Sequence, residues 1–520
     1  MSETDPSETP RAEGRLPGWL TPLLDAEQQR AVDTWAIGEC GIPSIALMER
    51  AGTGLADIVR ARAPEGRIVV VVGKGNNGGD GLVAARRLRD EGREVDVLLL
   101  AGADELRGDA RTSLERVPGP APEPFAPARL AGAAAIVDAI LGTGFSGEPR
   151  EPARSTITAI NDQAGSAVVV ACDIPSGVDG STGEIAGEAV RADATVTFNA
   201  AKPGLWIAPG KVHAGEVCVV DIGIPEGAPV EPSIGLIEPT VVDEIPRRGR
   251  DATKFAAGAV VVCGGSTGLT GAPSMACESA MRAGAGYVTA LVPASLNLVF
   301  EVRLLEAMSV PLPDVGGALQ PDALETVLER AERAGALVLG PGLGRADGTF
   351  ELARAVARRA EVALLLDADG LNAHAGRLSS LAGRSAPTVM TPHAGELARL
   401  LESDSSDVQA HRLRRARRTA AEAQATVVLK GDDSIVAAPD GRVGVSRGAA
   451  PALATAGTGD VLSGVIGAYL SKRMDPFAAA CAGVFVHARA GRLAAGAIAT
   501  EGVIASDVIQ LLPQARAAGA

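Results

Sequence analysis

The chain has 520 residues, which is too long for a single hydrophobic core and favours two or three domains. It carries 63 Asp and Glu against 49 Lys and Arg, and the net charge of −14 argues against a nucleic-acid or anionic-membrane partner. There is no membrane-length apolar run and no signal-peptide layout, and the 6 Cys are scattered, so we expect a cytoplasmic protein with reduced thiols.

Short apolar runs rich in β-branched residues recur along the chain, which is typical of parallel strands buried on both faces. We expect strands at 67–73, 94–100, 134–140, 167–172, 194–198, 217–222, 258–263, 286–292, 336–339, 362–366, 388–390 and 426–429. Helical segments are expected between them, at 81–91, 270–285, 323–334 and 407–424. This alternation predicts doubly wound α/β sheets.

A proline-rich stretch near the middle of the chain predicts the domain boundary. Prolines at positions 225, 229, 232, 239 and 246 leave little strand or helix pattern there. We therefore expect a disordered tail at 1–18, a first domain at 19–225 and a linker at 226–250. A second domain follows, and the resemblance described below places it at 240–515.

The first glycine-rich turn, Gly73–Gly81, follows a predicted strand and contains a literal G-x-G-x-x-G pattern. Dehydrogenases place an acid near the end of the next strand to hold the ribose, but here that strand ends in Leu100-Ala101-Gly102. Lys74 is followed by glycine, which excludes a Walker A loop. The carboxamides of Asn76 and Asn77, with Asp80, could coordinate a cation or bind hydroxyls, although the turn could also serve only the fold.

Two further loops place an acid at a strand end, followed by small polar residues. These are Asp138–Gly147 and Asp173–Asp179. The carboxyl ends of strands in open α/β sheets are where ligands bind, so we expect the three loops of this domain to meet there. Such acids can also cap turns or helices.

The second glycine-rich turn, Gly457–Asp460, precedes an apolar helix. Glycines let the backbone approach a phosphate, and a helix start stabilises developing negative charge. An acid at this position can take the proton from an attacking hydroxyl. A simple helix cap is the alternative.

Four motifs of the first domain resemble the epimerase domain of NAD(P)H-hydrate repair enzymes: Leu47–Gly52, Gly75–Gly81, Val137–Gly144 and Asp173–Asp179. Over about residues 20–225, the resemblance implies a Rossmann-like fold that interconverts the R and S forms of hydrated NADH and NADPH (NAD(P)HX). It implies a potassium ion held by Asn77, Asp138 and Ser176, whose oxygens suit such an ion. It implies substrate contacts by Asn76, Asn77, Gly78, Gly79, Asp80, Gly142, Thr143, Gly144, Phe145, Ser146, Gly147, Glu148 and Asp173.

Inverting the hydroxyl-bearing carbon requires ring opening or loss and return of the oxygen, which needs an acid or base. Asp173 is our catalytic candidate in this domain. Lys202 is a second candidate, although an ordinary exposed lysine would explain it as well.

The second domain resembles the ribokinase superfamily in Gly457–Asp460 and the ADP-dependent NAD(P)H-hydrate dehydratases in further loops: Gly264–Ser266, Thr270–Pro273, Gly340–Gly344, Asp367–Asn372 and Thr391–Glu396. The resemblance implies a ribokinase-like fold, Asp460 as the catalytic base, and Mg²⁺. It implies substrate contacts by Ala272, Gly342, His393 and Asp460, and ADP contacts by Lys430, Gly431, Asp432, Asp433, Ser434 and Gly459. The implied products are AMP, phosphate and NAD(P)H.

The two resemblances together indicate a bifunctional repair enzyme, with NAD(P)HX and ADP as small-molecule partners. We expect a homo-oligomer without nucleic-acid or membrane partners. The alternative is a small-molecule kinase of the ribokinase superfamily, fused to a non-catalytic ligand-binding or scaffold domain.

Overall fold

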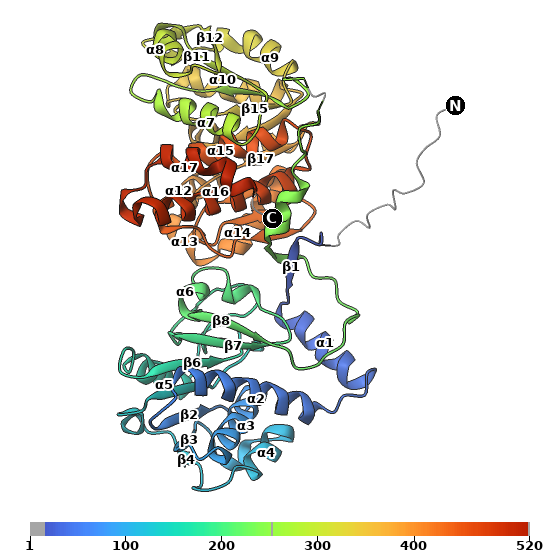
Figure 1. Cartoon of the computed structure of the whole chain (residues 1–520), viewed down its shortest axis with the longest axis vertical. Coiled ribbons are helices and arrows are strands. Elements are labelled where there is room, and N and C mark those ends of the chain that lie inside the picture. The colour runs from blue at the N-terminus through green and yellow to red at the C-terminus, as the bar shows by residue number, and fades with distance from the viewer. Residues whose placement is uncertain (1–15, 251–252, 518–520) are drawn as a thin grey trace, which may run out of the picture. The chain divides into compact units, whose positions relative to one another are not determined.

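The protein is described by a computed structural model covering residues 16–250 and 253–517, which fall into two compact units (Figure 1). Among these residues, 22–234 form the first unit, and 16–21 together with 235–517 form the second. The division after 234 lies inside the segment expected as a linker. Of the expected tail, 1–15 lie outside the described residues, whereas 16–18 belong to the second unit.

The first unit is built on a parallel sheet with the order β4-β3-β2-β5-β6-β7-β8. Its strands are β2 (Ile68–Val72), β3 (Val95–Leu99), β4 (Glu123–Pro124), β5 (Ala135–Ala139), β6 (Val168–Cys172), β7 (Ala194–Phe198) and β8 (Glu216–Val220). Its helices are α1 (Ala26–Gly38), α2 (Ser44–Arg62), α3 (Asn76–Asp90), α4 (Gly108–Glu115), α5 (Ala153–Asn161) and α6 (Gly210–Ala214).

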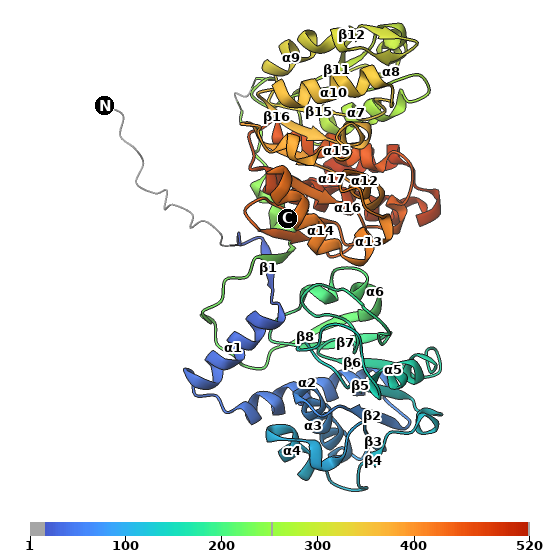
Figure 2. The ribbon, with the colours of Figure 1, turned by 180° about the vertical axis from the view of Figure 1, so that it is seen from behind.

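The two faces of this sheet are both buried, because successive strand residues point to opposite sides. Val70 and Val72 of β2 pack with α2 and α3, whereas Val69 and Val71 pack with Ile157 of α5. Figures 1 and 2 show the helices over the sheet from opposite sides. An uninterrupted run of valines therefore suits this strand, as its sequence predicts.

The second unit contains a mixed sheet with the order β1-β9-β20-β19-β18-β17-β16-β15-β10-β11-β12. Its strands are β1 (Leu20–Leu23), β9 (Ile234–Ile237), β10 (Ala259–Cys263), β11 (Tyr287–Pro293), β12 (Met308–Leu312), β15 (Ala336–Leu339), β16 (Ala363–Leu366), β17 (Thr388–Met390), β18 (Thr426–Leu429), β19 (Ile435–Ala437) and β20 (Val443–Val445). A separate hairpin joins β13 (Asp314–Val315) and β14 (Ala318–Leu319).

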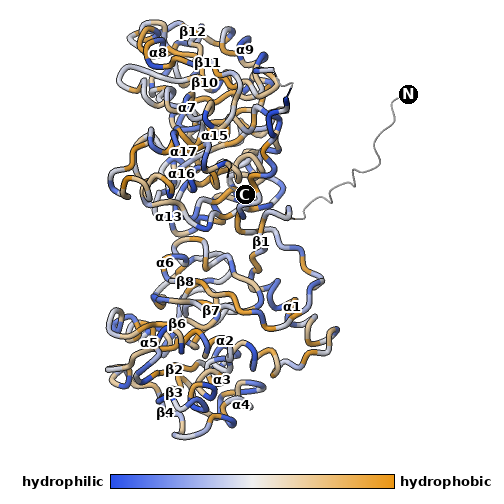
Figure 3. Tube along the Cα trace, in the orientation of Figure 1, coloured by the Kyte–Doolittle hydropathy of each residue, from blue (hydrophilic) through white to orange (hydrophobic). Residues whose placement is uncertain are grey.

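Helices of the second unit flank this sheet, and some of them share a core of small aliphatic residues with one of its faces. Its helices are α7 (Gly271–Arg282), α8 (Asn297–Arg303), α9 (Leu324–Glu332), α10 (Asp347–Arg359), α11 (Ala368–Asn372), α12 (Ala394–Leu400), α13 (Ser405–Ala410), α14 (Arg412–Ala423), α15 (Thr458–Leu470), α16 (Pro476–Ile498) and α17 (Ala505–Ala517). Val260 and Val262 of β10 pack with α7, α15, α16 and α17. In Figure 3, orange apolar segments recur along each unit between blue polar connections.

Three features correct the sequence-based expectations. The proline-rich segment 226–250 contains strand β9, because the apolar run Ile234–Ile237 lies between its prolines and pairs beside β1. The sheet of the second unit is not parallel throughout, since β18, β19 and β20 pair antiparallel. The helix expected at 407–424 is divided into α13 and α14, with a break at His411.

The cysteines of the described segments are all free, with Cys172, Cys263, Cys277 and Cys481 buried. Among the helices that the structure describes, none has both the length and the apolar character needed to cross a membrane.

Candidate active sites

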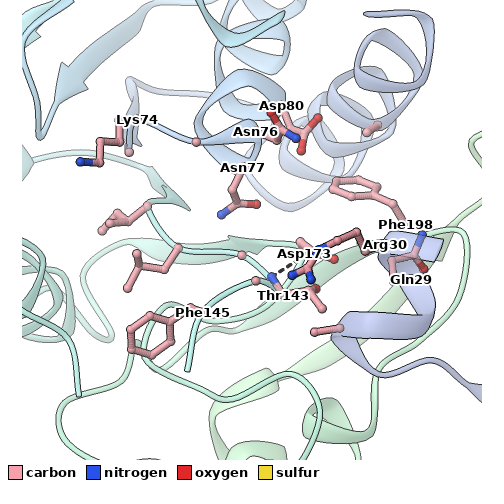
Figure 4. A pocket seen from close by; sticks show the side chains of 18 of the residues that line it. Gln29, Arg30, Lys74, Asn76, Asn77, Asp80, Thr143, Phe145, Asp173 and Phe198 are labelled. Carbon is pink, nitrogen blue, oxygen red and sulfur yellow. Dashed lines mark hydrogen bonds between the residues drawn. The ribbon is translucent and has the colours of Figure 1, made fainter. Parts of the chain in front are cut away.

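The first candidate site lies at the carboxyl end of the first unit's sheet, where the strand order reverses. β2 and β5 are neighbours, but the chain continues from β2 toward β3 on one side and from β5 toward β6 on the other. Ligands of open α/β sheets bind at such a switch point because the loops diverge there. A cavity of about 1120 Å³ opens at this place (Figure 4).

Most of the predicted substrate contacts line this cavity: Asn76, Asn77, Asp80, Gly142, Thr143, Gly144, Phe145, Ser146, Gly147, Glu148 and Asp173. Gly78 and Gly79 do not. A Cβ at Gly78 would collide with the carbonyl oxygen of Gly73, and one at Gly79 would press on Met48. These glycines permit close packing of α3, and their assigned substrate contacts stay predictions.

The helix expected from residue 81 begins earlier, at Asn76. The Asn76–Asp80 segment is therefore the first part of α3, whose leading N–H groups have no partner inside the helix. These N–H groups and the partial positive charge of the helix start suit a phosphate or another anion.

Asp173 is the most heavily hydrogen-bonded carboxylate of the cavity. Its Oδ2 accepts the Thr143 backbone N–H at 3.0 Å and also the Thr143 hydroxyl. Its Oδ1 accepts the Thr197 hydroxyl at 3.1 Å and lies 3.0 Å from Lys202 Nζ. Asp173 has φ of 66°, a left-handed conformation that non-glycine residues rarely adopt outside functional sites.

Lys202 is buried, with its side chain only 1% exposed. Its Nζ donates at 2.9 Å to both Thr197 Oγ1 and Phe198 O, and it pairs with Asp173. The interpretation of Lys202 as an ordinary exposed lysine is therefore wrong. Burial alone would raise the pKa of Asp173, but the charge of Lys202 and the hydrogen bonds from Thr143 outweigh it and lower this pKa.

Asp80 has the opposite environment, although it lines the same cavity. Burial, followed by the charges of Asp173 and Asp33, raises the pKa of Asp80 well above its usual value. Asp33 comes from α1, where burial raises its pKa although Gln29 donates a hydrogen bond to it at 2.9 Å. The environments of Asp173 and Asp80 therefore shift their pKa values in opposite directions, which favours the ionised form of Asp173 and the neutral form of Asp80.

The residues assigned to a potassium ion gather around the 140–142 loop. Ser176 donates to Asp138 from its backbone N at 2.8 Å and from its hydroxyl at 2.6 Å. Leu141 N donates to Ser176 Oγ at 2.9 Å, and a Cβ on Gly142 would lie 3.3 Å from Asn77 Oδ1.

Two observations fit a cation at this place. The Asn77 side chain is buried, and neither its Oδ1 nor its Nδ2 has a hydrogen-bond partner. Asp138 is fully buried, and burial raises its pKa to about 6 despite the hydrogen bonds from Ser176. A cation would satisfy the orphaned amide oxygen and favour the ionised form of Asp138.

The second candidate site lies at the switch point of the other sheet, between β10 and β15. The loops after these strands touch, because Ser266 Oγ donates to Gly342 O at 2.9 Å. Gly342 has φ of 59°, and a Cβ there would lie 3.2 Å from Ala272 Cβ. The structure therefore brings the predicted substrate contacts Ala272 and Gly342 together.

A buried network joins three of the remaining loops of this unit. Asp367 accepts Lys430 Nζ at 3.0 Å through Oδ1 and the Ser463 hydroxyl at 2.7 Å through Oδ2. Glu396 Oε2 lies 3.7 Å from the same Nζ. The site assignment from sequence omits Asp367, Glu396 and Ser463, although the position of Asp367 directly after β16 is a strand-end signal like that of Asp173.

Asp460 lies in the first turn of α15, whose N-cap residue Gly457 has φ of 90°. Burial and the charges of Asp367 and Glu396 raise the pKa of Asp460 to about 7, although Lys430 opposes the shift. A carboxylate with this pKa is suited to accept a proton near neutral pH. A Cβ on Gly459 would lie 3.4 Å from Lys430 Nζ, so the lysine reaches the start of this helix.

The turn assigned to ADP is held by a buried ion pair. Arg412 contacts both oxygens of Asp433, each at 2.9 Å, and each side chain is 3% exposed. Ser434 Oγ donates to Gly431 O at 2.8 Å. Because both oxygens of Asp433 contact Arg412, this carboxylate holds the conformation of the turn. The contact with ADP assigned to Asp433 stays a prediction.

His393 caps helix α12. Its Nδ1 accepts from Gly395 N at 3.0 Å and Glu396 N at 3.4 Å, while Glu396 accepts from His393 N at 2.9 Å. This is a reciprocal capping arrangement. The side chain remains 54% exposed, its Nε2 lies 3.5 Å from Glu396 Oε1, and burial lowers its pKa.

Comparison with known protein families matches both units. Residues 44–204 match the family of YjeF-related protein N-termini. Residues 260–514 match the NAD(P)H-hydrate dehydratase family.

Two relatives and one solved structure illustrate what the chain is similar to. The bifunctional NAD(P)H-hydrate repair enzyme Nnr of Moorella thermoacetica is 38% identical over 509 residues, covering 94% of this chain and 96% of that protein. The enzyme of the same name from Salinibacter ruber is 38% identical, with 95% and 96% covered. The ADP/ATP-dependent NAD(P)H-hydrate dehydratase of Bacillus subtilis, co-crystallised with ATP/Mg²⁺, is 27% identical with a TM-score of 0.46, covering 53% of this chain and 94% of that one.

Proposed function

Because this chain belongs to the family of bifunctional NAD(P)H-hydrate repair enzymes, we propose that its two units catalyse successive steps in the repair of hydrated NADH and NADPH. The first unit interconverts the R and S epimers. The second dehydrates the S epimer and converts ADP to AMP and phosphate. The observation that carries this proposal is the match of both domain families in one chain, whose two units each contain a strand-order switch point.

In the first unit, Asp173 is the proton acceptor. The pairing with Lys202 and the hydrogen bonds from Thr143 keep it ionised and fix its orientation. The lining residues from α3 and the 142–148 loop hold the dinucleotide over it. A fixed acceptor of this kind needs no reorganisation when the substrate binds.

The cavity of the first unit offers positively charged side chains to the phosphates of the substrate, although the protein as a whole is acidic. Arg30, Lys74 and Arg150 line the cavity, and none of them forms an ion pair within the described ranges. The start of α3 adds backbone N–H groups. This local charge lets a chain with a net charge of −14 bind a dinucleotide.

A potassium ion is held by Asn77, Asp138 and Ser176 in this proposal. The support is the unpartnered Asn77 amide beside the 140–142 loop and the buried Asp138 carboxylate. When bound, the ion supplies positive charge next to the substrate loops. Asn77 and Ser176 thereby fix the position of that loop against α3.

In the second unit, Asp460 takes the proton from the hydroxyl of the S hydrate as that oxygen attacks the terminal phosphorus of ADP, and AMP leaves. The ring nitrogen then expels phosphate, and loss of a ring proton restores NAD(P)H. The backbone N–H groups of Gly457–Gly459 and the ammonium of Lys430 stabilise the negative charge that develops on the transferred group.

Mg²⁺ neutralises charge on the nucleotide phosphates when it is bound. The described ranges contain no group of three His, Cys, Asp or Glu that could hold a metal. Mg²⁺ commonly binds through substrate phosphates with few protein ligands, and the donor set here fits that mode. Lys430 and the α15 amides remain the protein's own contribution to charge stabilisation.

We further propose that the chain works as a homo-oligomer in the cytoplasm. The buried free thiols are compatible with a reducing compartment. Light scattering on the purified protein tests the oligomeric state, since a strictly monomeric mass contradicts it.

Purified R and S epimers test the division of labour between the units. We expect Asp173→Asn to stop ADP-dependent repair of the R epimer while sparing that of the S epimer. Asp460→Asn should stop repair of both. A mixture of the two variants should restore repair of the R epimer, because each supplies the site that the other lacks. Equal use of both epimers by Asp173→Asn, above the spontaneous rate, contradicts the assignment.

A further inference from the structure

Asp173 and Asp80 both line the first unit's cavity, and their surroundings favour opposite protonation states. Asp173 is surrounded by donors from Thr143, Thr197 and Lys202. Asp80 also lines the cavity, but its carboxyl group makes no hydrogen bond or ion pair within the described ranges. In Figure 4, Asp80 projects from α3, and Asp173 lies on the facing side of the cavity.

Three charged groups from different parts of the first unit act on Asp80. Asp33 lies on α1, Asp173 follows β6 and Lys202 follows β7. Lys202 pairs with Asp173 at 3.0 Å, and its charge opposes the rise in the pKa of Asp80 without outweighing burial and the two carboxylates. Partial burial without a donor then leaves the protonated form as the stable form of Asp80.

Building on the proposed epimerase function, we propose that Asp80 is the general acid of this site and that Asp173 is the base that works with it. Pairs of carboxyl groups whose environments separate their protonation states divide acid and base roles in this way. The position of Asp80 within helix α3 does not explain why its carboxyl group faces the cavity without a partner. A purely structural acid would be expected to cap the helix or pair with a cation.

The proposed reaction is balanced without any oxidant or reductant. Asp80 donates its proton to the hydroxyl oxygen of the hydrated ring, and the carbon–oxygen bond breaks to release water. The lone pair of the ring nitrogen forms the carbon–nitrogen double bond of a cationic intermediate. Water then adds to the opposite face of that carbon, the electron pair returns to nitrogen, and Asp173 accepts the water's proton. Exchange with solvent returns a proton from Asp173 to Asp80.

The decisive variant is Asp80→Asn, because an amide has the shape of a neutral carboxyl group but cannot donate a catalytic proton. We expect the rate of R-to-S conversion to fall by about 100-fold or more, the usual contribution of a general acid. Affinity for the S hydrate, measured by calorimetry, should stay within a few-fold of the unsubstituted protein. Asp90→Asn, which changes the exposed carboxyl group at the other end of α3, outside the cavity lining, should leave the rate unchanged.

A second variant tests the electrostatic origin of the acid. The charge of Asp33 helps to keep Asp80 protonated. Conversion should therefore decline at alkaline pH as Asp80 ionises, and Asp33→Asn should move this decline to lower pH. The pH profile of Asp33→Asn tests the acid role of Asp80 even if Asp80→Asn does not fold.

The outcomes separate this inference from the proposed function. If the unsubstituted protein does not accelerate epimerisation, both fail. If it does, and Asp80→Asn converts the R epimer at a rate within a few-fold of it, the acid role of Asp80 is refuted while the epimerase function stands. An alkaline decline that moves to higher pH in Asp33→Asn also overturns the inference.

Discussion

Lys202 Nζ lies 3.0 Å from Asp173 Oδ1, and the lysine side chain is 1% exposed. The two residues come from loops after neighbouring strands, β6 and β7. A buried lysine is costly unless it is paired, and here two further acceptors, Thr197 Oγ1 and Phe198 O, complete its hydrogen bonding. The pair therefore keeps Asp173 ionised at the floor of the cavity.

Lys202→Met tests this relationship. Removing one member of a buried pair leaves an uncompensated charge and typically costs about 3–5 kcal/mol, so the first unit's free energy of unfolding should fall by that order. The pKa of Asp173 should rise, because its largest favourable charge is lost, and the acid limb of the epimerase pH profile should move to higher pH. Urea unfolding and the pH profile measure the two effects.

Lys202→Arg is the matched control, since it keeps the positive charge. We expect a smaller loss of stability and a smaller shift of the acid limb. An acid limb that stays in place in Lys202→Met contradicts the assigned role of the lysine.

The pH dependence of the dehydratase should report on Asp460. A base with a pKa of about 7 is protonated below that pH, so activity should rise as pH increases through this range. Lys430→Met removes a charge that lowers this pKa and should move the rise to higher pH. Asp367→Asn removes a charge that raises it and should move the rise to lower pH. Shifts of the same sign in both variants would rule out Asp460 as the titrating base.

The ion pair of Arg412 with Asp433 should support both stability and nucleotide binding. Arg412→Met leaves a buried carboxylate without its partner and should cost about 3–5 kcal/mol in the second unit. The KM for ADP should rise more than kcat falls, because the pair holds the turn after Lys430. The double variant Arg412→Met/Asp433→Leu should recover stability but not the KM, whereas recovery of both contradicts a positioning role.

Exchange of monovalent cations tests the ion site. We expect R-to-S conversion to be faster in potassium than in lithium chloride at equal ionic strength, because Asn77, Asp138 and Ser176 offer oxygens beside the 140–142 loop. Asn77→Leu should remove the difference between the salts. Dehydration of the S epimer by the second unit provides the internal control, and equal salt dependence in both steps argues against a specific site in the first.

The sequence predicts the strands and the strand-end acids well, because both depend on short local patterns. The valine run of β2, the position of Asp138 near the end of β5 and that of Asp173 directly after β6 need no knowledge of distant contacts. The α/β class is confirmed, as is family membership in both units.

Features that depend on partners far along the chain could not be predicted. The sequence around Lys202 does not reveal that the side chain turns inward to meet Asp173, 29 positions earlier in the numbering. Nothing local marks Gly78 and Gly79 as packing residues, or Asp433 as the partner of Arg412. The strand at Ile234–Ile237 was obscured by its flanking prolines, although its apolar run was visible.

The most direct test of the whole account is to incubate the purified protein with a mixture of the R and S hydrates of NADH and an excess of ADP. We expect the near-ultraviolet absorbance of reduced nicotinamide to recover for both epimers, with AMP and phosphate formed in equal amounts to the NADH released. A phosphorylated hydrate that accumulates, or absorbance that does not recover, would contradict the repair function and favour a small-molecule kinase.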